Sequence, residues 1–267
     1  MYLNTKKEQV FMGRIISVAN QKGGVGKTTT AVNLSACLAE KGKKVLTVDI
    51  DPQGNTTRGL GVEKSKLEHT TYELLIGESS LKETIKPNIY ENLSLMPSDV
   101  ELAGAEVELI GVEDNSFILK RLLEEIRDDY EFIIIDCPPS LSILTVNALS
   151  ASDTVLVPIQ CEFFALEGLS QLMHTIELVK KRLNPHLEIE GVVFTMYDAR
   201  TNLSLQVVDE VKKKLRRTNI YQTIIPRNVR LGEAPSYGLP INLYDDKSKG
   251  AESYRLLADE VIARETN

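Results

Sequence analysis

Short, nearly unbroken apolar runs alternate along this chain with longer segments in which apolar residues recur every three or four positions. The short runs predict strands, because a strand that is covered on both faces is apolar almost throughout. The clearest of them read VLTVDI, FIIID and TVLVPI. The predicted strands span residues 15–20, 44–50, 92–96, 131–136, 154–160, 189–197 and 221–226.

The longer segments have the period of amphipathic helices and lie between the predicted strands. They span residues 27–41, 163–183, 203–217 and 251–263, and Gly42 follows the first of them as a helix-terminating glycine does. Alternation of strands and helices over the whole length predicts an α/β fold, a doubly wound, mostly parallel sheet with helices on both faces. Ligands of such sheets bind beyond the carboxyl ends of the strands, so functional residues should directly follow strands.

Composition narrows the class of protein. The 267 residues are 42% hydrophobic and 26% charged, which suits a globular chain with one substantial core. No run of 18 apolar residues and no secretory signal are present, so we expect a cytoplasmic protein without membrane attachment. Cys37, Cys137 and Cys161 form no Cys-x-x-Cys pair, which is typical of a reduced compartment. The three histidines lack metal-ligand spacing, which argues against zinc.

Charge is unevenly distributed along the chain. The formal net charge of −7, taken as a single number, argues against nucleic-acid binding. Residues 199–250, however, hold ten lysines and arginines against five acidic residues. Such asymmetry can present a basic face on an acidic protein, although solvated helix faces also collect lysines.

The first predicted strand runs into the segment QKGGVGKTT, which a helix follows. Three glycines allow successive backbone N–H groups to turn towards one point at the helix N-terminus, where an anion can bind. In this context Lys27 is placed to reach the β- and γ-phosphates of a nucleotide, Thr28 to ligate Mg²⁺, and Thr29 to contact the α-phosphate. The predicted phosphate-binding residues are Gly23, Gly24, Val25, Gly26, Lys27, Thr28 and Thr29.

Two further predicted strands end in aspartates. Phosphoryl transfer needs a divalent cation held in place and a water aligned with the leaving group. Asp136 closes the run FIIID, where a carboxylate would hold Mg²⁺ through water, and Asp51 follows VLTVDI, where it could orient the attacking water. Asp49 is predicted either to support the strand end or to lie in the outer shell of the metal. Aspartates that merely cap turns are the simpler alternative.

The phosphate-binding loop departs from the standard G-x-x-x-x-G-K-[ST] pattern, because Gln21 replaces the first glycine and a second lysine, Lys22, lies inside the loop. KGGVGKT resembles the deviant Walker A motif of the ParA/MinD family of P-loop NTPases, in which this lysine crosses an ATP sandwich dimer. DIDPQGN resembles the switch I segment of ParA-type ATPases, and DCPPSL resembles their switch II segment. The resemblance implies a catalytic set of Lys22, Lys27 and Asp51, with Asp51 as the hydrolytic aspartate.

The resemblance covers about residues 13–265 and is greatest to the short, Soj kind of ParA. It implies one ATPase domain over residues 13–267, with residues 1–12 as a flexible extension. In that family the loop after the strand ending in PRN wraps the adenine, which makes Pro226, Arg227 and Asn228 base-pocket residues by resemblance.

Two arginines, Arg200 and Arg230, match family positions that contact DNA once the dimer has formed. Contacts from arginines to phosphates carry no base code, so the implied DNA binding is nonspecific and depends steeply on salt. Intramolecular salt bridges are the alternative for both arginines. The run KKKLRR over residues 212–217 is interpreted as a solvated helix end, with an auxiliary DNA contact as the second reading.

The function implied by the resemblance is ATP-dependent partitioning of a chromosome or plasmid. ATP and Mg²⁺ are the expected cofactors, and hydrolysis is expected to be slow until a ParB-type partner stimulates it and releases the homodimer from the nucleoid.

A MinD-like membrane-positioning ATPase and a ParA-like regulator of replication initiation or sporulation are the alternatives. The C-terminal segment AESYRLLADEVIARETN holds four acids against two arginines, which disfavours membrane attachment. An iron–sulfur reductase would need two cysteines near the dimer axis, and a carboxylate-activating synthetase would need a second substrate pocket.

Overall fold

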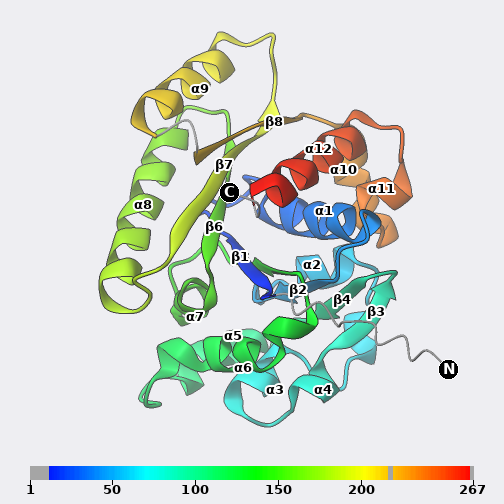
Figure 1. The fold of residues 1–267 in the computed structure, drawn as a ribbon, viewed down its shortest axis with the longest axis vertical. Coiled ribbons are helices and arrows are strands. Elements are labelled where there is room, and N and C mark those ends of the chain that lie inside the picture. Colours follow the sequence, from blue (N-terminus) through cyan, green and yellow to red (C-terminus); the bar gives the residue numbers. More distant parts are fainter. Residues whose placement is uncertain (1–11, 216–218, 265–267) are drawn as a thin grey trace, which may run out of the picture.

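The computed structural model of the protein describes residues 12–215 and 219–264. These residues form an eight-stranded sheet with the strand order β3-β4-β2-β5-β1-β6-β7-β8 (Figure 1). The strands are β1 Arg14–Val18, β2 Val45–Asp49, β3 Lys86–Tyr90, β4 Leu93–Met96, β5 Phe132–Asp136, β6 Thr154–Gln160, β7 Glu188–Tyr197 and β8 Ile220–Pro226. All neighbours in the sheet run parallel except β3, which pairs antiparallel with β4.

The mostly parallel sheet confirms the fold class that the sequence predicts, and each predicted strand overlaps an observed one. The edge strand β3 was not predicted. Its sequence, KPNIY, has no apolar run and contains a proline, and two of its residues are exposed. A proline is tolerated there because one side of an edge strand needs no ladder hydrogen bonds.

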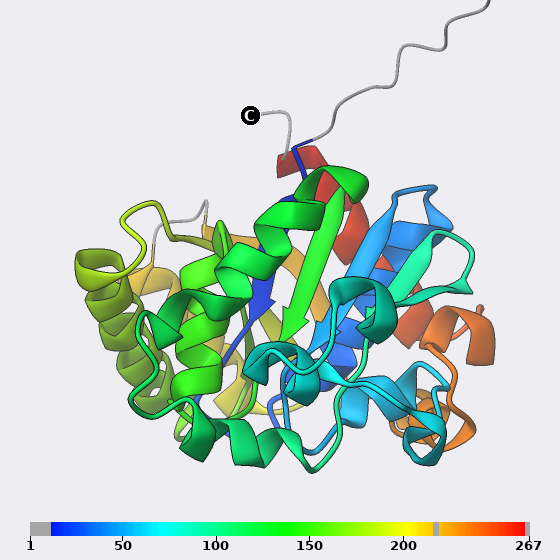
Figure 2. The same cartoon turned by 90° about the horizontal axis from the view of Figure 1, so that it is seen from below.

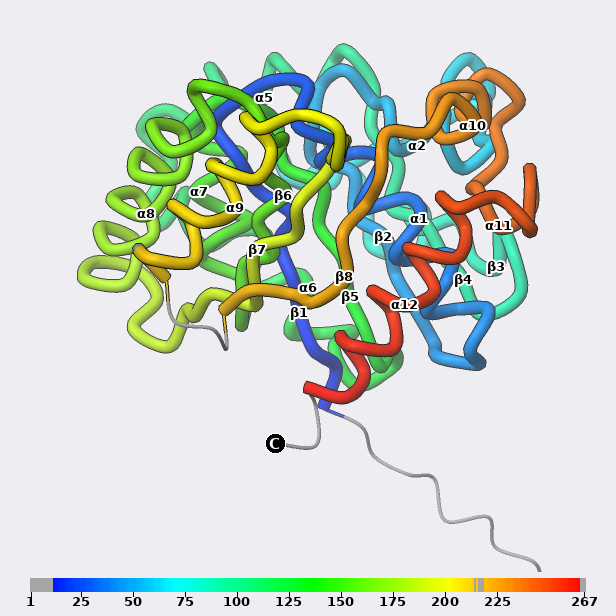
Figure 3. The backbone as a smooth tube through the Cα atoms, turned by 90° about the horizontal axis from the view of Figure 1, so that it is seen from above, coloured from blue at the N-terminus to red at the C-terminus, as the bar shows by residue number. Residues whose placement is uncertain are grey.

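Helices cover both faces of the sheet, as the sequence predicts. One face carries α3 Thr71–Ile76, α4 Leu81–Thr84, α5 Leu102–Glu108, α6 Ile118–Ile126, α7 Ile143–Ala151, α8 Ala165–Arg182 and α9 Asn202–Lys214. The other carries α1 Lys27–Glu40, α2 Asn55–Gly59, α10 Val229–Glu233, α11 Ile241–Tyr244 and α12 Lys249–Ala263. Figure 2 shows the green helices of the first face in front of the strands, and Figure 3 shows the red tube of α12 beside the blue tube of α1 on the second.

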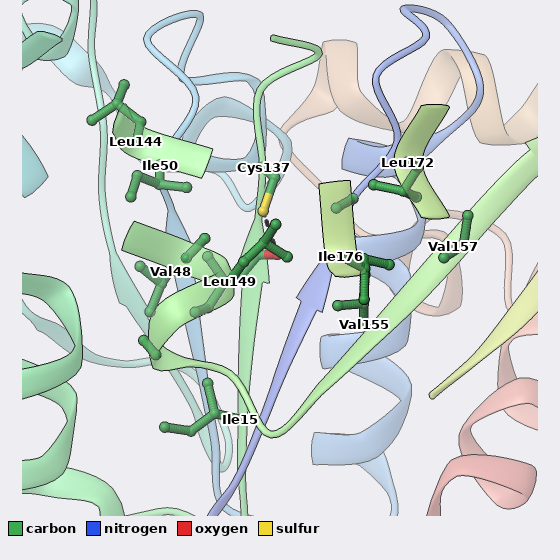
Figure 4. Close-up of a cluster of buried hydrophobic side chains, with 14 of the residues drawn as sticks. Ile15, Val48, Ile50, Cys137, Leu144, Leu149, Val155, Val157, Leu172 and Ile176 are labelled. Atoms are coloured by element: carbon green, nitrogen blue, oxygen red, sulfur yellow. Dashed lines mark hydrogen bonds between the residues drawn. The ribbon is translucent and has the colours of Figure 1, made fainter. Parts of the chain in front are cut away.

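Each face of the sheet has its own apolar core. In Figure 4 side chains from β1, β2 and β6 and from α7 and α8 meet on one face, with Ile15, Leu149 and Ile176 among them. Cys137 lies in this cluster, and all three cysteines are buried and free. The cysteines therefore act as small apolar side chains, as their spacing predicts.

The middle of the sheet holds β1, which lies between β5 and β6. The chain leaves β1 towards β2 on one side, and after β5 it crosses to β6 on the other. The crevice beyond the carboxyl end of β1 is therefore a topological switch point, the usual ligand site of a doubly wound sheet.

Two sequence-based predictions concern segments at the ends of the chain. The flexible extension falls on residues 1–12, of which 1–11 lie outside the described residues. None of the helices in the described part of the chain has the length and apolar character needed to span a membrane. The C-terminal helix α12 instead packs against α1 and β8, and its Tyr254, Leu257 and Val261 are buried.

Candidate functional site

Three neighbouring strands, β2, β5 and β1, bring their carboxyl ends together at the switch point. Asp49 and Asp136 end β2 and β5 and are direct partners in the ladder, while Val18 near the end of β1 is paired with Asp136 on the other side. The loop of residues 20–26 follows β1 and leads into α1. The candidate residues therefore lie at the carboxyl ends of three neighbouring strands, where the sequence predicts them.

The loop is shaped by its glycines. Gly24 and Gly26 have positive φ angles of 76° and 91°, which side-chain-bearing residues rarely adopt, and Gly26 caps α1. The backbone of the loop is thus free to point N–H groups at an anion at the start of α1. At residue 23 a Cβ atom would meet nothing within 4 Å, so Gly23 faces open space within this chain.

Two polar side chains hold the loop in place through hydrogen bonds, and neither was predicted from the sequence. Asn20 donates from Nδ2 to the Pro158 carbonyl at 2.8 Å and accepts the Lys22 N–H at 3.0 Å. Thr195, near the end of β7, donates its hydroxyl to the Val25 carbonyl at 2.8 Å. Both follow the rule that polar residues at the carboxyl ends of parallel strands deserve functional scrutiny, which is the signal that could have found them.

Lys27 begins α1 and is almost fully buried, with 6% of its surface exposed. Its ammonium donates to the Lys22 carbonyl at 3.0 Å, which leaves further donors for phosphate oxygens. Burial lowers the pKa of Lys27, and the Asp136 carboxylate opposes this change. A buried cation beside an anion-binding loop suits the role predicted for this residue.

The carboxylate of Asp136 is held at one oxygen only. Oδ2 accepts hydroxyl protons from Thr28 at 2.8 Å and from Thr56 at 2.7 Å. Oδ1 is buried and has no hydrogen-bond partner among the described residues. Burial, reinforced by the nearby Asp49 carboxylate, raises the pKa of Asp136 to about 8.

A buried carboxyl group whose Oδ1 has no partner among the described residues fits a divalent cation, because a cation would favour the ionised form and the cation or its water would satisfy the lone pairs of Oδ1. The described residues contain no group of three or more His, Cys, Asp or Glu side chains that could hold a metal. Thr28 and Asp136 would therefore supply the protein's share of a Mg²⁺ site, and nucleotide oxygens and water would supply the rest.

Asp49 and Asp51 have different surroundings. Asp49 is fully buried and accepts the N–H and the hydroxyl of Thr57 at 2.8 and 2.7 Å and the Asp51 N–H at 3.2 Å. These contacts favour the first of the two roles predicted for Asp49, support of the strand end. Within the part of the chain that the structure describes, the Asp51 carboxylate accepts one hydrogen bond, from the Gln53 N–H at 2.9 Å, and 7% of the surface of Asp51 is exposed.

The segment PRN lines a cavity of about 510 Å³ beside the phosphate-binding loop. Pro226 ends β8, and Arg227 and Asn228 follow it. The cavity also borders Met196, whose φ of 48° is unusual for a residue with a side chain. The remaining lining residues are Gly26, Thr29, Thr195, Ile225, Val229, Leu231, Gly232, Glu233 and Tyr254. An apolar cavity that opens beside the start of α1 has the size and position to hold a nucleotide base.

The second lysine of the loop does not point to the phosphate site of its own chain. Lys22 forms an ion pair with Glu162, which follows β6, and its ammonium lies 5.7 Å from the ring centre of Phe164. Phe164 and its neighbour Phe163 are exposed and in edge-to-face contact with each other. The two lysines of the loop therefore have separate surroundings: Lys27 is buried, and Lys22 is partly exposed beside Glu162 and Phe164.

Both arginines that resemble DNA-binding positions are engaged within the chain. Arg200 donates to both oxygens of Asp198, at 2.9 and 2.7 Å, while 87% of its side chain stays exposed. Arg230 pairs with Glu233 at 2.8 Å and lies 3.4 Å from Asp245. These are surface pairs, which contribute little to stability and exchange readily.

The structure describes only part of the basic run at the end of α9. Lys212 and Lys213 are exposed near the last residue of α9, Lys214, as expected for a solvated helix end. Lys213 pairs with Glu210 at 2.6 Å. Residues 216–218 lie outside the described residues, so the prediction for Arg216 and Arg217 rests on sequence alone.

Fold and site together define a P-loop nucleotide-binding protein, because a glycine loop between β1 and α1 is combined with Thr28, Lys27 and Asp136. A family model described as an AAA domain matches residues 13–189. Soj of Bacillus subtilis, a sporulation initiation inhibitor protein, is 58% identical over 94% of this chain and 99% of that protein. The chromosome partitioning protein ParA of Myxococcus xanthus is 51% identical over 96% of this chain and 90% of that protein.

Solved structures agree with this assignment. Cobyrinic acid a,c-diamide synthase from Mycobacterium smegmatis, with bound ADP and magnesium, has a TM-score of 0.84 and 38% identity, and 96% of each chain is covered. The cell division ATPase MinD of Pyrococcus furiosus has a TM-score of 0.77 and 28% identity over 95% of this chain and 100% of that one. The chain belongs to the Soj/ParA family of chromosome partitioning ATPases. The nucleotide and magnesium in the solved relative agree with the cofactors that the sequence predicts.

Proposed function

We propose that this protein is a Mg²⁺-dependent ATPase that partitions chromosomal or plasmid DNA. ATP joins two copies into a sandwich dimer, the dimer binds DNA without base specificity, and a ParB-type partner stimulates a slow hydrolysis that releases it. The observation that carries the proposal is the contrast between the two lysines of one loop. Lys27 is buried beside Asp136, whereas the side chain of Lys22 is 30% exposed and paired with Glu162, so that a second copy can reach it.

The nucleotide site of one copy is assigned from its contacts. The loop of residues 23–26, with Lys27 and Thr29, would bind the phosphates, and the cavity bordered by Pro226 would take the adenine. Thr28 and Asp136 would hold Mg²⁺, which when bound neutralises charge on the phosphates. The contacts of Asp136 support this assignment. Its Oδ1 is buried and has no hydrogen-bond partner among the described residues, and a cation or its water would satisfy that oxygen.

Hydrolysis is assigned to Asp51, with Lys22 contributed by the facing copy. The Asp51 side chain accepts a single backbone N–H and keeps lone pairs that can orient a water. A site that needs an ammonium from another chain is incomplete in a single copy, so turnover should be slow before the dimer is correctly assembled. The Asp51→Ala variant should bind ATP, dimerise and remain on DNA without turnover.

DNA binding is assigned to Arg200 and Arg230, which are exposed, the first in the loop after β7 and the second in α10, which follows β8. A dimer would present about four such arginines to phosphates, and each contact adds about 0.9 to the salt dependence of log affinity. The two arginines of a single copy would bind DNA weakly, so DNA binding should require the dimer and therefore ATP. The protein would accordingly associate with the nucleoid within the cytoplasm.

The test is DNA binding by the purified protein in ADP, in ATP and in a slowly hydrolysed ATP analogue, at several salt concentrations. We expect tight binding only with the two triphosphates, and we expect the Arg200→Ala form to dimerise normally but to lose DNA affinity. A Lys82→Ala form, which loses an exposed lysine of α4 outside the run 212–217, controls for the loss of one positive charge elsewhere on the surface. Equal DNA affinity in all three nucleotides would exclude the proposal.

Regulation of replication initiation or of sporulation would use the same residues, and a relative is named a sporulation initiation inhibitor protein. The two roles differ in the partner. Capture of a ParB-like, DNA-binding protein by the Asp51→Ala form would support partitioning, whereas capture of an initiator protein would support regulation. A MinD-like role is disfavoured because α12 buries Tyr254, Leu257 and Val261 in the core.

A further inference from the structure

Two consecutive threonines of α2 each hold one of the aspartates that end neighbouring strands. Thr56 donates its hydroxyl to Oδ2 of Asp136 at 2.7 Å. Thr57 donates its N–H and its hydroxyl to Oδ2 of Asp49 at 2.8 and 2.7 Å. Both threonines are fully buried, and the two aspartates are paired across the β2–β5 ladder. A helix of five residues is thereby tied to the ends of two strands.

The contact of Thr56 decides how the Asp136 carboxylate is oriented. Oδ2 takes two hydroxyl protons, from Thr28 and Thr56, while Oδ1 has no partner in the described part of the chain. A hydroxyl has one proton but two lone pairs, so Thr28 can bind a metal through oxygen and still donate to Asp136. Two donors on one oxygen restrict rotation of the carboxylate and leave its other oxygen available to another partner.

We propose that Thr56 is a positioning residue for the metal site, which fixes Oδ2 of Asp136 so that Oδ1 faces the cation or its water. The inference rests on the proposed function, since it assumes that Asp136 serves Mg²⁺. Residues that hydrogen-bond to metal-binding carboxylates determine the orientation of those carboxylates and affect metal affinity. Thr56 acts through Asp136 and does not itself touch the substrate.

The same short helix connects the metal site with the segment that carries Asp51. The Thr57 hydroxyl accepts the Ser98 N–H at 2.8 Å, and the Ser98 hydroxyl donates to the Asp51 carbonyl at 2.9 Å. Thr56 and Thr57 therefore place α2 between the carboxylate that serves the metal and the residue assigned to water. Loss of the Thr56 hydroxyl should free the Asp136 carboxylate to rotate. It should leave the contacts between Thr57 and Asp49 in place, because these do not depend on Thr56.

The experiment measures magnesium binding rather than turnover. Fluorescently labelled ADP is bound to the full-length protein, and the free Mg²⁺ concentration that half-saturates the fluorescence change is determined for the wild type and for Thr56→Val. Valine has nearly the shape of threonine but cannot donate. We expect the Mg²⁺ requirement of Thr56→Val to rise about 10–100-fold. We also expect ADP affinity in the presence of a chelator to stay at the wild-type value.

Two matched variants separate positioning from packing. Thr56→Ser keeps the hydroxyl and should restore the wild-type Mg²⁺ requirement. Thr47→Val removes the hydroxyl of another fully buried threonine, on β2, that has no hydrogen-bond partner in the described part of the chain, and it should change nothing. If Thr56→Val does not fold, Thr56→Ala is compared with Thr56→Ser in its place.

The outcomes are distinct. An unchanged Mg²⁺ requirement in a folded Thr56→Val protein would overturn the inference and leave the proposed function standing. A Thr56→Ser protein as impaired as Thr56→Val would also overturn it, because the defect would then come from packing. A wild-type protein that binds no ADP at any Mg²⁺ concentration would overturn both the proposed function and this inference.

Discussion

The residues at the carboxyl ends of β2 and β5 place several charges in a small buried volume. Burial raises the pKa of Asp49 to about 6, and burial together with the Asp49 carboxylate raises the pKa of Asp136 to about 8. Lys27 is the buried cation beside them, and burial lowers its own pKa. One ammonium cannot neutralise two carboxylates, so without a further cation the charged forms of Asp49 and Asp136 are disfavoured. A bound Mg²⁺ would remove this cost, because it supplies the missing positive charge.

This electrostatic arrangement predicts how stability depends on pH without nucleotide and magnesium. A carboxyl whose pKa is higher in the folded than in the unfolded protein binds more protons when folded, so the free energy of unfolding falls as pH rises between the two values. For Asp136 that window extends from 3.8 to about 8. Urea unfolding should show lower stability at about pH 8 than at about pH 6. In Asp136→Asn the decline should be smaller, and a decline of wild-type size would contradict the assignment.

The pairing of Arg230 with Glu233 predicts that an acidic residue restrains a DNA contact. Glu233 holds the Arg230 guanidinium at 2.8 Å and also accepts the Tyr244 hydroxyl at 3.1 Å. We expect Glu233→Gln to increase DNA affinity in ATP by a few-fold at most, because exposed ion pairs are weak. Glu63→Gln, which alters a similar exposed pair with Lys66, controls for the change in net charge. A Glu233→Gln protein that binds DNA no better than Glu63→Gln would refute the restraint.

At the scale of the elements, the start of α2 depends on one glycine. Gly54 has a φ of 55°, and a Cβ atom there would lie 2.5 Å from the Ser98 carbonyl oxygen. Gly77, at the end of α3, has a φ of 84° but nothing within 4 Å of its Cβ position. Gly77→Ala should therefore cost only the left-handed strain, about 1–2 kcal/mol, and Gly54→Ala should cost clearly more. Urea denaturation of the two variants measures the difference, and equal losses would argue against the steric contact.

Strands and long helices were predictable from sequence because their patterns are long and regular. The buried strands β2, β5 and β6 are apolar almost throughout, and α8 and α12 complete several turns with one buried side. The short helices, such as α2 and α10, have five residues each and show too few turns to reveal a period. Their positions are set by contacts with the sheet and with loops, which the local sequence does not display.

For the whole molecule, the decisive expectation is that two copies meet across the phosphate-binding loop. Gly23→Val tests it, because a side chain at residue 23 meets nothing within 4 Å in the single chain. The variant should fold and bind ATP like the wild type but remain monomeric, since the branched side chain would crowd the loop of the facing copy. Light scattering after size exclusion with magnesium and ATP measures the mass. A Gly23→Val protein that dimerises normally would show that the loops do not approach each other.

The sequence by itself determined the fold class, the phosphate-binding loop and the aspartates that follow strands. These features are local: a run of apolar residues, a set of glycines beside Lys27, and a carboxylate at the end of FIIID each need only a few adjacent residues to be read. The family resemblance added roles for Lys22, Asp51 and the two arginines, which single residues in one sequence do not reveal.

Tertiary structure alone decided which side chains touch. It separated Asp49, held by Thr57, from Asp51, whose side chain accepts a single backbone N–H, although the two are only two positions apart. It also brought Thr56 to Asp136, residues separated by 80 positions. Hydrogen bonds between distant residues depend on how parallel strands are ordered across the sheet, and that order is fixed by packing of the whole chain.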